Sequence, residues 1–108
     1  MIEISDGTRQ RIRAQFPEGA WGQVEQMLRE RCGDTLPFVD ASRTGLAERI
    51  RYAVLKLSGG RISELEHHVA LAARDWRDVL LAAGFGHDPA AHLTWMPEAG
   101  TLRPTSSP

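Results

Sequence analysis

The cluster Asp75-Trp76-Arg77-Asp78 is the part of this sequence whose residue types could most readily do chemistry. Two carboxylates and a guanidinium beside an indole could bind a polar ligand or an arginine of a partner, and a histidine nearby would add a proton-transfer group. The same residues also have a structural interpretation, with Trp76 on an apolar stripe and an aspartate at a helix N-terminus. The sequence favours the structural interpretation and leaves an enzyme or ligand-binding protein centred on this cluster as an alternative.

Histidines and a single cysteine, Cys32, raise the question of a metal site. Zinc ligands recur at close spacings on one helix face. His67 and His68 are adjacent, so on a helix they point about 100° apart. Glu64 and His68 could share a metal, but the sequence offers no third ligand. Because Cys32 falls on an apolar stripe, we interpret it as a core residue and predict no metal site.

The sequence also lacks the motifs of nucleophilic catalysis. It contains no G-x-S-x-G motif. The glycine-rich stretches Ser58-Gly59-Gly60 and Gly84-Phe85-Gly86 follow predicted helices, whereas phosphate-binding glycine loops follow strands. We therefore assign no catalytic residue and no cofactor, and the sequence argues against an enzyme.

Basic residues concentrate in the segment 43–61, which carries a net charge of +4 in a chain whose net charge is −1. These residues are Arg43, Arg49, Arg51, Lys56 and Arg61. A nucleic-acid-binding regulator that uses this segment is a second alternative. It is disfavoured because the next predicted helix opens with Ser63-Glu64-Leu65-Glu66, whose acids would repel phosphates.

The size and composition indicate one ordinary globular domain. The chain has 108 residues, of which 42% are apolar and 25% charged, and one cysteine cannot form an internal disulfide. The N-terminus has no basic stretch followed by an apolar one, and no apolar run approaches the roughly 20 residues of a membrane-spanning helix. We expect a cytoplasmic protein.

Periodic apolar residues and helix-end signals predict an all-α fold. Ser5 can cap a helix over 7–16, and Pro17 ends it and opens a second helix over 18–32. The next stretch, 33–43, has the composition of a loop, and we expect Leu36, Phe38 and Val39 to pack it against the core.

The third predicted helix, 43–58, is apolar on two faces. One stripe comprises Leu46, Ile50, Ala53, Val54 and Leu57. Tyr52 and Leu55 fall on roughly the opposite side. Such a helix is either central in its own domain or forms half of an interface.

Residues 63–83 keep one apolar face, and the S-x-x-E pattern at Ser63 predicts a capping box. The continuous phase favours one long helix, although Asp75 could instead cap a separate helix that starts at Trp76. A short helix is expected at 89–95. Together these elements predict an irregular bundle of four to five helices, with residues 1–97 as a single helical domain and 98–108 as a flexible tail.

Two stretches of the chain resemble a small bacterial helical protein type that has no assigned function. They are Glu48-Arg49-Ile50-Arg51-Tyr52-Ala53-Val54-Leu55-Lys56-Leu57-Ser58-Gly59-Gly60 and Asp75-Trp76-Arg77-Asp78-Val79-Leu80-Leu81-Ala82-Ala83-Gly84-Phe85. The resemblance covers about half of the chain. It implies a standalone helical protein from bacteria, and no activity follows from it.

The favoured function is protein–protein interaction, either as a homodimer or as a small adaptor or accessory subunit. Tyr, Trp, Met and Arg are the residue types enriched at the centres of interfaces. The expected partner-binding residues are Arg49, Arg51, Tyr52, Leu55, Trp95 and Met96. In this hypothesis the second apolar face of the 43–58 helix docks on the partner and the arginines lie at its rim.

Overall fold

The computed structural model describes residues 2–97, and these contain helices but no strand. The prediction of an all-α fold is therefore confirmed. The elements in chain order are α1 (Asp6–Gln15), the 3-10 turn η1 (Glu18–Ala20), α2 (Trp21–Arg31), α3 (Thr44–Ser58), α4 (Ile62–Ala83) and the 3-10 turn η2 (Ala91–Thr94). The tail expected at 98–108 lies outside the described residues.

Local sequence explains where most helices begin and end. The Ser5 hydroxyl caps α1 by accepting a hydrogen bond from the Thr8 N–H at 3.1 Å. Pro17 ends α1 because it drives the preceding residue into extended backbone. Helices α3 and α4 end at Gly59 and Gly84, which have φ angles of 60° and 82° that favour glycine.

Two local predictions were wrong. Helix α4 begins at Ile62, so Ser63 lies inside its first turn and no side chain caps the helix. The helix expected at 89–95 is only the turn η2, although Asp88 Oδ1 does accept a hydrogen bond from the Ala90 N–H at 2.9 Å.

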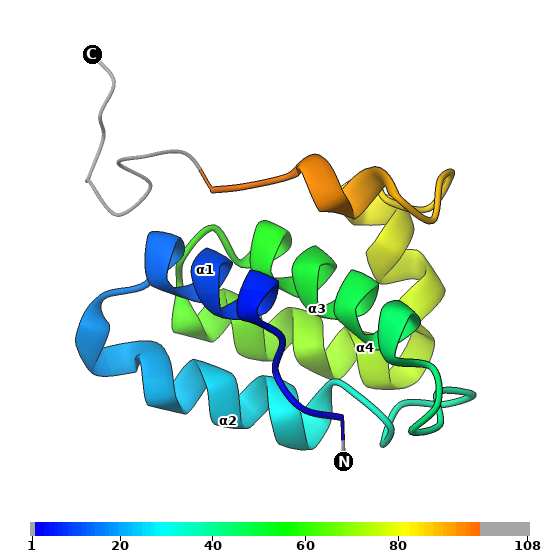
Figure 1. Cartoon of the computed structure of the whole chain (residues 1–108), viewed down its shortest axis with the longest axis horizontal. Coiled ribbons are helices and arrows are strands. Elements are labelled where there is room, and N and C mark those ends of the chain that lie inside the picture. Colours follow the sequence, from blue (N-terminus) through cyan, green and yellow to red (C-terminus); the bar gives the residue numbers. More distant parts are fainter. Residues whose placement is uncertain (1, 98–108) are drawn as a thin grey trace.

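Helix α3 lies at the centre of the bundle. Its most extensive packing is against α4, and it also contacts α1 and η2. Figure 1 shows α4 running alongside α3 and then turning upward at one end of the molecule. The chain then returns as the segment around η2, which lies over α3 (Figure 1).

Helix α3 is apolar on two faces because it is central in its own domain, and not because one face is left free for an interface. The side chains of Tyr52 and Leu55 are 2% and 0% exposed, and Ile50 and Val54 on the other face are also fully buried. Other segments of the same chain thus cover both apolar faces. The expectation that Tyr52 and Leu55 form an accessible docking surface was therefore wrong.

A buried arginine joins two segments of the chain to α3. Arg51 is 1% exposed and donates hydrogen bonds to the carbonyl oxygens of Ile2, Glu3 and Cys32 at 2.7, 2.7 and 2.8 Å. Burial lowers the pKa of Arg51 below its ordinary value. The guanidinium therefore ties the N-terminal segment and the end of α2 to the central helix, and it cannot lie at the rim of an interface.

A second arginine fastens the C-terminal segment. Arg11 is 6% exposed and donates to the carbonyl oxygens of Gly7, Leu93 and Trp95 at 2.9, 3.3 and 2.9 Å. Its guanidinium carbon lies 4.2 Å from the centre of the Tyr52 ring. The stretch after η2 is therefore held against α1 and α3 through backbone carbonyls.

None of the helices in residues 2–97 combines the length and the apolar character that a membrane crossing requires.

Replacing Arg51 with methionine should destabilise the fold by about 3 kcal/mol, because buried carbonyl groups would lose their donor. Urea unfolding followed by circular dichroism measures this change. Arg31→Met, at an exposed position at the end of α2, is the control and should change stability by less than about 0.5 kcal/mol. Equal stability of the two variants would contradict the structural role of Arg51.

Two glycine-to-alanine changes in helices should have opposite effects. A Cβ atom at Gly7 would lie 2.2 Å from the Tyr52 hydroxyl, so Gly7→Ala should cost about 2 kcal/mol through overpacking. At Gly22 no atom lies within 4 Å, so Gly22→Ala should stabilise α2 by about 0.5–1 kcal/mol. Thermal unfolding of both variants tests the close approach of α1 to α3.

Candidate functional site

Helix α4 bends sharply at Asp75, and we call this bend the elbow. Asp75 has the non-helical angles φ −159° and ψ 90°, and its Oδ1 accepts a hydrogen bond from the Arg77 N–H at 3.1 Å. Asp75 therefore caps the limb that starts at Trp76. The expected long helix is present as α4, with a kink at Asp75, and the cap at Asp75 that the alternative predicted is present as well.

A cleft opens between the two limbs of α4. We call it the elbow cleft; it has a volume of about 540 Å³, which lies in the range of ligand and docking pockets. Its apolar walls come from Leu57, Leu71, Val79 and Ala82, and its polar groups from His68, Arg74, Asp75 and Asp78. The elbow thus brings two aspartates of the Asp75–Asp78 cluster together with a histidine from the previous limb.

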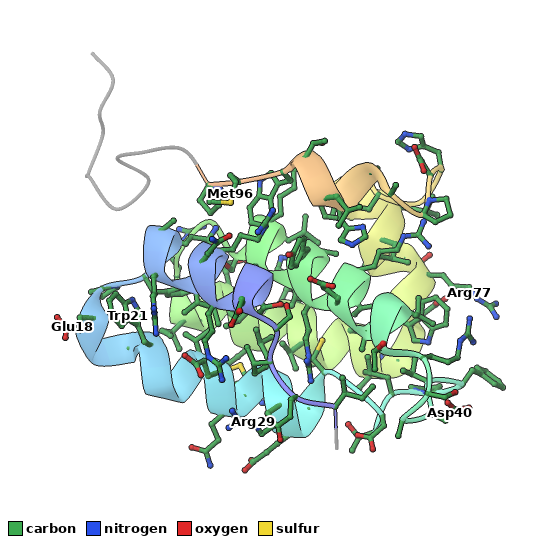
Figure 2. The ribbon with its side chains drawn as sticks, in the orientation of Figure 1. Glu18, Trp21, Arg29, Asp40, Arg77 and Met96 are labelled. Carbon is green, nitrogen blue, oxygen red and sulfur yellow. The ribbon has the colours of Figure 1, made fainter. Side chains whose placement is uncertain are left out.

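The charged groups at this cleft are not committed to contacts within the fold. Among residues 2–97, Arg74 and Asp78 have no recorded hydrogen bond or ion pair, and the Asp75 carboxylate accepts only the capping bond. Arg77 instead stacks its guanidinium 5.5 Å from the centre of the Trp76 ring. Figure 2 shows Arg77 extending outward at the end of the molecule where α4 turns.

His68 lies at the same cleft with one ring nitrogen unused. Its Nε2 is 3.8 Å from Glu64 Oε1, while its buried Nδ1 has no partner in the described part of the chain. Burial, and then the neighbouring His67, lower the pKa of His68 below its usual value. The imidazole is therefore neutral at pH 7 and can accept or donate a hydrogen bond.

An exposed aromatic ring stands beside the elbow. Phe38 is 79% exposed and has a φ of 65°, a left-handed conformation that is costly for a bulky residue. The neighbouring Pro37 is fixed to α4, because its carbonyl oxygen accepts a hydrogen bond from Trp76 Nε1 at 2.6 Å. A shallow hollow of about 190 Å³ joins Phe38 to Arg74 and Asp75, so the ring and the cleft flank the same two residues.

A second hollow, of about 530 Å³, lies between the start of α3 and η2 and includes Arg43, Arg49 and Glu48. Each of its charged side chains makes a contact within the fold, although the buried Arg49 Nε has no partner in the described part of the chain. Arg43 and Arg49 donate to the carbonyl oxygens of Phe38 and Phe85, and Glu48 accepts a hydrogen bond from Ser5. We therefore regard the elbow cleft as the stronger candidate site.

The basic segment 43–61 serves the backbone of its own chain. Besides Arg43, Arg49 and Arg51, Lys56 donates to the Ala83 carbonyl oxygen at 2.8 Å, at the negative end of α4. Arg61 is exposed at the start of α4. Most of this positive charge is thus directed at helix ends and carbonyl groups rather than displayed as a phosphate-binding surface.

The expected partner-binding residues do not form one surface. Arg51, Tyr52 and Leu55 are buried, as described above, and Trp95 is half-buried against the core. Met96 alone is prominently exposed, at 46%. Figure 2 places Met96 well away from Arg77 and the elbow.

Sequence reasoning missed the residues that define the candidate site. It assigned Phe38 to a loop packed on the core, and it did not connect Leu57 or Leu71 with the Asp75–Asp78 cluster. The available signal was Asp75 itself: a capping residue inside a long apolar pattern predicts a bend, and a bend leaves a hollow between its limbs.

The described residues do not suggest metal or thiol chemistry. No group of three or more His, Cys, Asp or Glu side chains within 2–97 is placed to hold a metal ion. Burial raises the pKa of the Cys32 thiol to about 12, so it stays protonated, as expected of a core residue.

Comparisons of the chain with models of protein families, with curated proteins and with solved structures found no match. The resemblance to a bacterial protein type stays a prediction, and the function has to be argued from the site itself.

The fold should lose stability as the solution becomes acidic. Burial lowers the pKa of both His68 and His92 in the folded state, so the unfolded chain binds protons more readily. The stability from these neutral imidazoles is complete above the unfolded pKa of about 6.5 and is lost as the pH falls below it. Urea midpoints at about pH 7.5 and 5.5 should show this loss, and the variant His68→Asn/His92→Asn should show a smaller one. Equal urea midpoints for the wild type at the two pH values would contradict the predicted loss of stability.

Proposed function

We propose that this protein is a protein–protein interaction module that binds its partner at the elbow. The docking surface comprises the elbow cleft together with Pro37, Phe38, Trp76 and Arg77, and we call it the elbow surface. The observation that carries the proposal is the pairing of a projecting Phe38 ring with an open, apolar cleft on either side of Arg74 and Asp75.

The residue types at the elbow surface are those that dominate binding energy in interfaces. Aromatic and arginine anchors that fill pockets account for most measured hot spots. Trp76 and Phe38 supply aromatic surface, Arg74 and Arg77 supply guanidinium groups, and Leu71 and Val79 line the hollow. A partner could bury this apolar area without unfolding any part of the chain.

The backbone strain at Phe38 supports a functional role for this ring. A bulky residue in the left-handed region costs about 1–3 kcal/mol, and such residues cluster at functional sites. The exposed ring gains no burial within its own fold that could offset this cost. An interface that buries the ring would provide that compensation.

Binding explains the cleft better than catalysis does. The residues lining it include a histidine and two aspartates, but no hydrogen bond among residues 2–97 joins His68 to either aspartate, as a paired base and nucleophile would require. The His68 imidazole and the free Arg74 and Asp78 side chains are therefore assigned to recognition of polar groups on the partner.

Site-specific photo-crosslinking in the native cells tests this function. Placing a benzophenone-bearing phenylalanine analogue at position 38 should give discrete covalent adducts, whereas the same analogue at the exposed Leu93 should give none. The adducts should disappear with Ala82→Arg, because a long side chain at this exposed position can pair with Asp78 and cover the cleft.

The matched control is Ala70→Arg. This exposed position lies four residues after Glu66, so the new arginine can pair with an acid as in Ala82→Arg, but Ala70 does not line the cleft. Adducts should persist in this variant. Equal labelling from positions 38 and 93, or adducts that survive Ala82→Arg, would show that the elbow is not the docking site.

A further inference from the structure

We infer that the partner at the elbow surface is a second copy of this chain, with Phe38 of each copy seated in the elbow cleft of the other. This inference rests on the proposed function and names its partner. It joins two features that a single chain leaves unused, a projecting ring and an apolar hollow, and both adjoin Arg74 and Asp75.

Shape favours a reciprocal arrangement. When a knob and a hollow lie on the same surface, a two-fold rotation lets each copy insert its knob into the other, and both contacts form at once. The apolar part of the cleft includes Leu57 and Leu71, which are only partly buried and so available to contact a phenyl ring, and about 540 Å³ is ample space for one. A heterologous partner would have to supply both a ring-accepting hollow and an apolar knob of its own.

The charges of the elbow surface also favour a second copy as the partner. The elbow surface carries two arginines, Arg74 and Arg77, and two aspartates, Asp75 and Asp78, so it has no net charge. A partner bearing one sign of charge would be repelled by half of these groups. The proposed two-fold pair requires Arg74 of each copy to reach Asp78 of the other across the axis. Both side chains lack partners among residues 2–97, so they can pair without breaking an existing contact.

The association should be visible in the mass of the full chain. Light scattering or sedimentation over a wide range of concentrations should show a species of twice the 12.0 kDa chain mass at high concentration. Phe38→Asn removes the ring, yet asparagine tolerates a positive φ, so the variant should stay folded and associate at least tenfold more weakly. Met96→Asn, at an exposed position away from the elbow, is the control and should associate like the wild type.

Charge reversal provides a test that does not depend on the stability of one variant. Arg74→Asp alone and Asp78→Arg alone place like charges opposite each other in a two-fold pair, so each should weaken association by about tenfold or more. Mixing the two variants should restore it, because the mixed pair has only opposite charges at these positions. Far-ultraviolet circular dichroism confirms that each variant is folded.

The outcomes separate this inference from the function on which it rests. A wild-type chain that stays at 12.0 kDa at every concentration overturns self-association, as does a dimer that persists in Phe38→Asn or fails to re-form in the mixture. If crosslinking from position 38 then captures a different protein in a cleft-dependent way, the interaction module stands with another partner. If position 38 captures nothing, both fail.

Discussion

The buried guanidinium of Arg51 is the interaction on which the arrangement of this protein depends. Burying an arginine is costly unless its donors are satisfied, and here they are satisfied by main-chain carbonyl oxygens from the N-terminus and from the end of α2. Gly33 leaves the necessary space, because a Cβ at this position would lie 2.9 Å from Arg51 Nη2. These segments converge on one side chain of α3 and cover both of its apolar faces. The proposed docking surface therefore lies mostly on α4 and the 33–43 loop, and α3 contributes only Leu57 to it.

The same use of cations recurs around α3. Arg11 holds the C-terminal segment through the Leu93 and Trp95 carbonyl groups, and Lys56 neutralises the end of α4 at Ala83. A helix C-terminus carries partial negative charge and unpaired carbonyl groups, so a nearby cation satisfies both needs. The basic character of segment 43–61 is therefore largely structural. Arg74 and Asp78, like the exposed Arg31 and Arg61, make no such contact among the described residues.

Periodicity predicted the fold class and most helix ranges, because the burial of one face of a helix leaves a regular trace in the sequence. It also predicted the apolar stripe of α3, in which Ile50, Ala53 and Val54 are fully buried and Leu46 and Leu57 partly buried. It could not tell whether Tyr52 and Leu55 face solvent or another segment, since the η2 segment and α1 cover α3 only through long-range contacts. For that reason the prediction that Tyr52 and Leu55 form an accessible surface was wrong. The position of Phe38 was equally hidden, because its exposure depends on how Trp76 anchors the neighbouring carbonyl group.

The elbow cleft is open because the second limb of α4 is tethered at both of its ends. Trp76 Nε1 holds the start of the limb to the loop carbonyl of Pro37, and Lys56 Nζ holds its end to α3. Straightening at Asp75 would cost the capping bond and the Trp76 hydrogen bond, so both contacts favour the bent form of α4. Val79 is buried in this form, whereas Leu57 and Leu71 at the cleft are only partly buried. These two side chains would gain further burial from a partner, and the proposed two-fold pair supplies it through the exposed Phe38 ring.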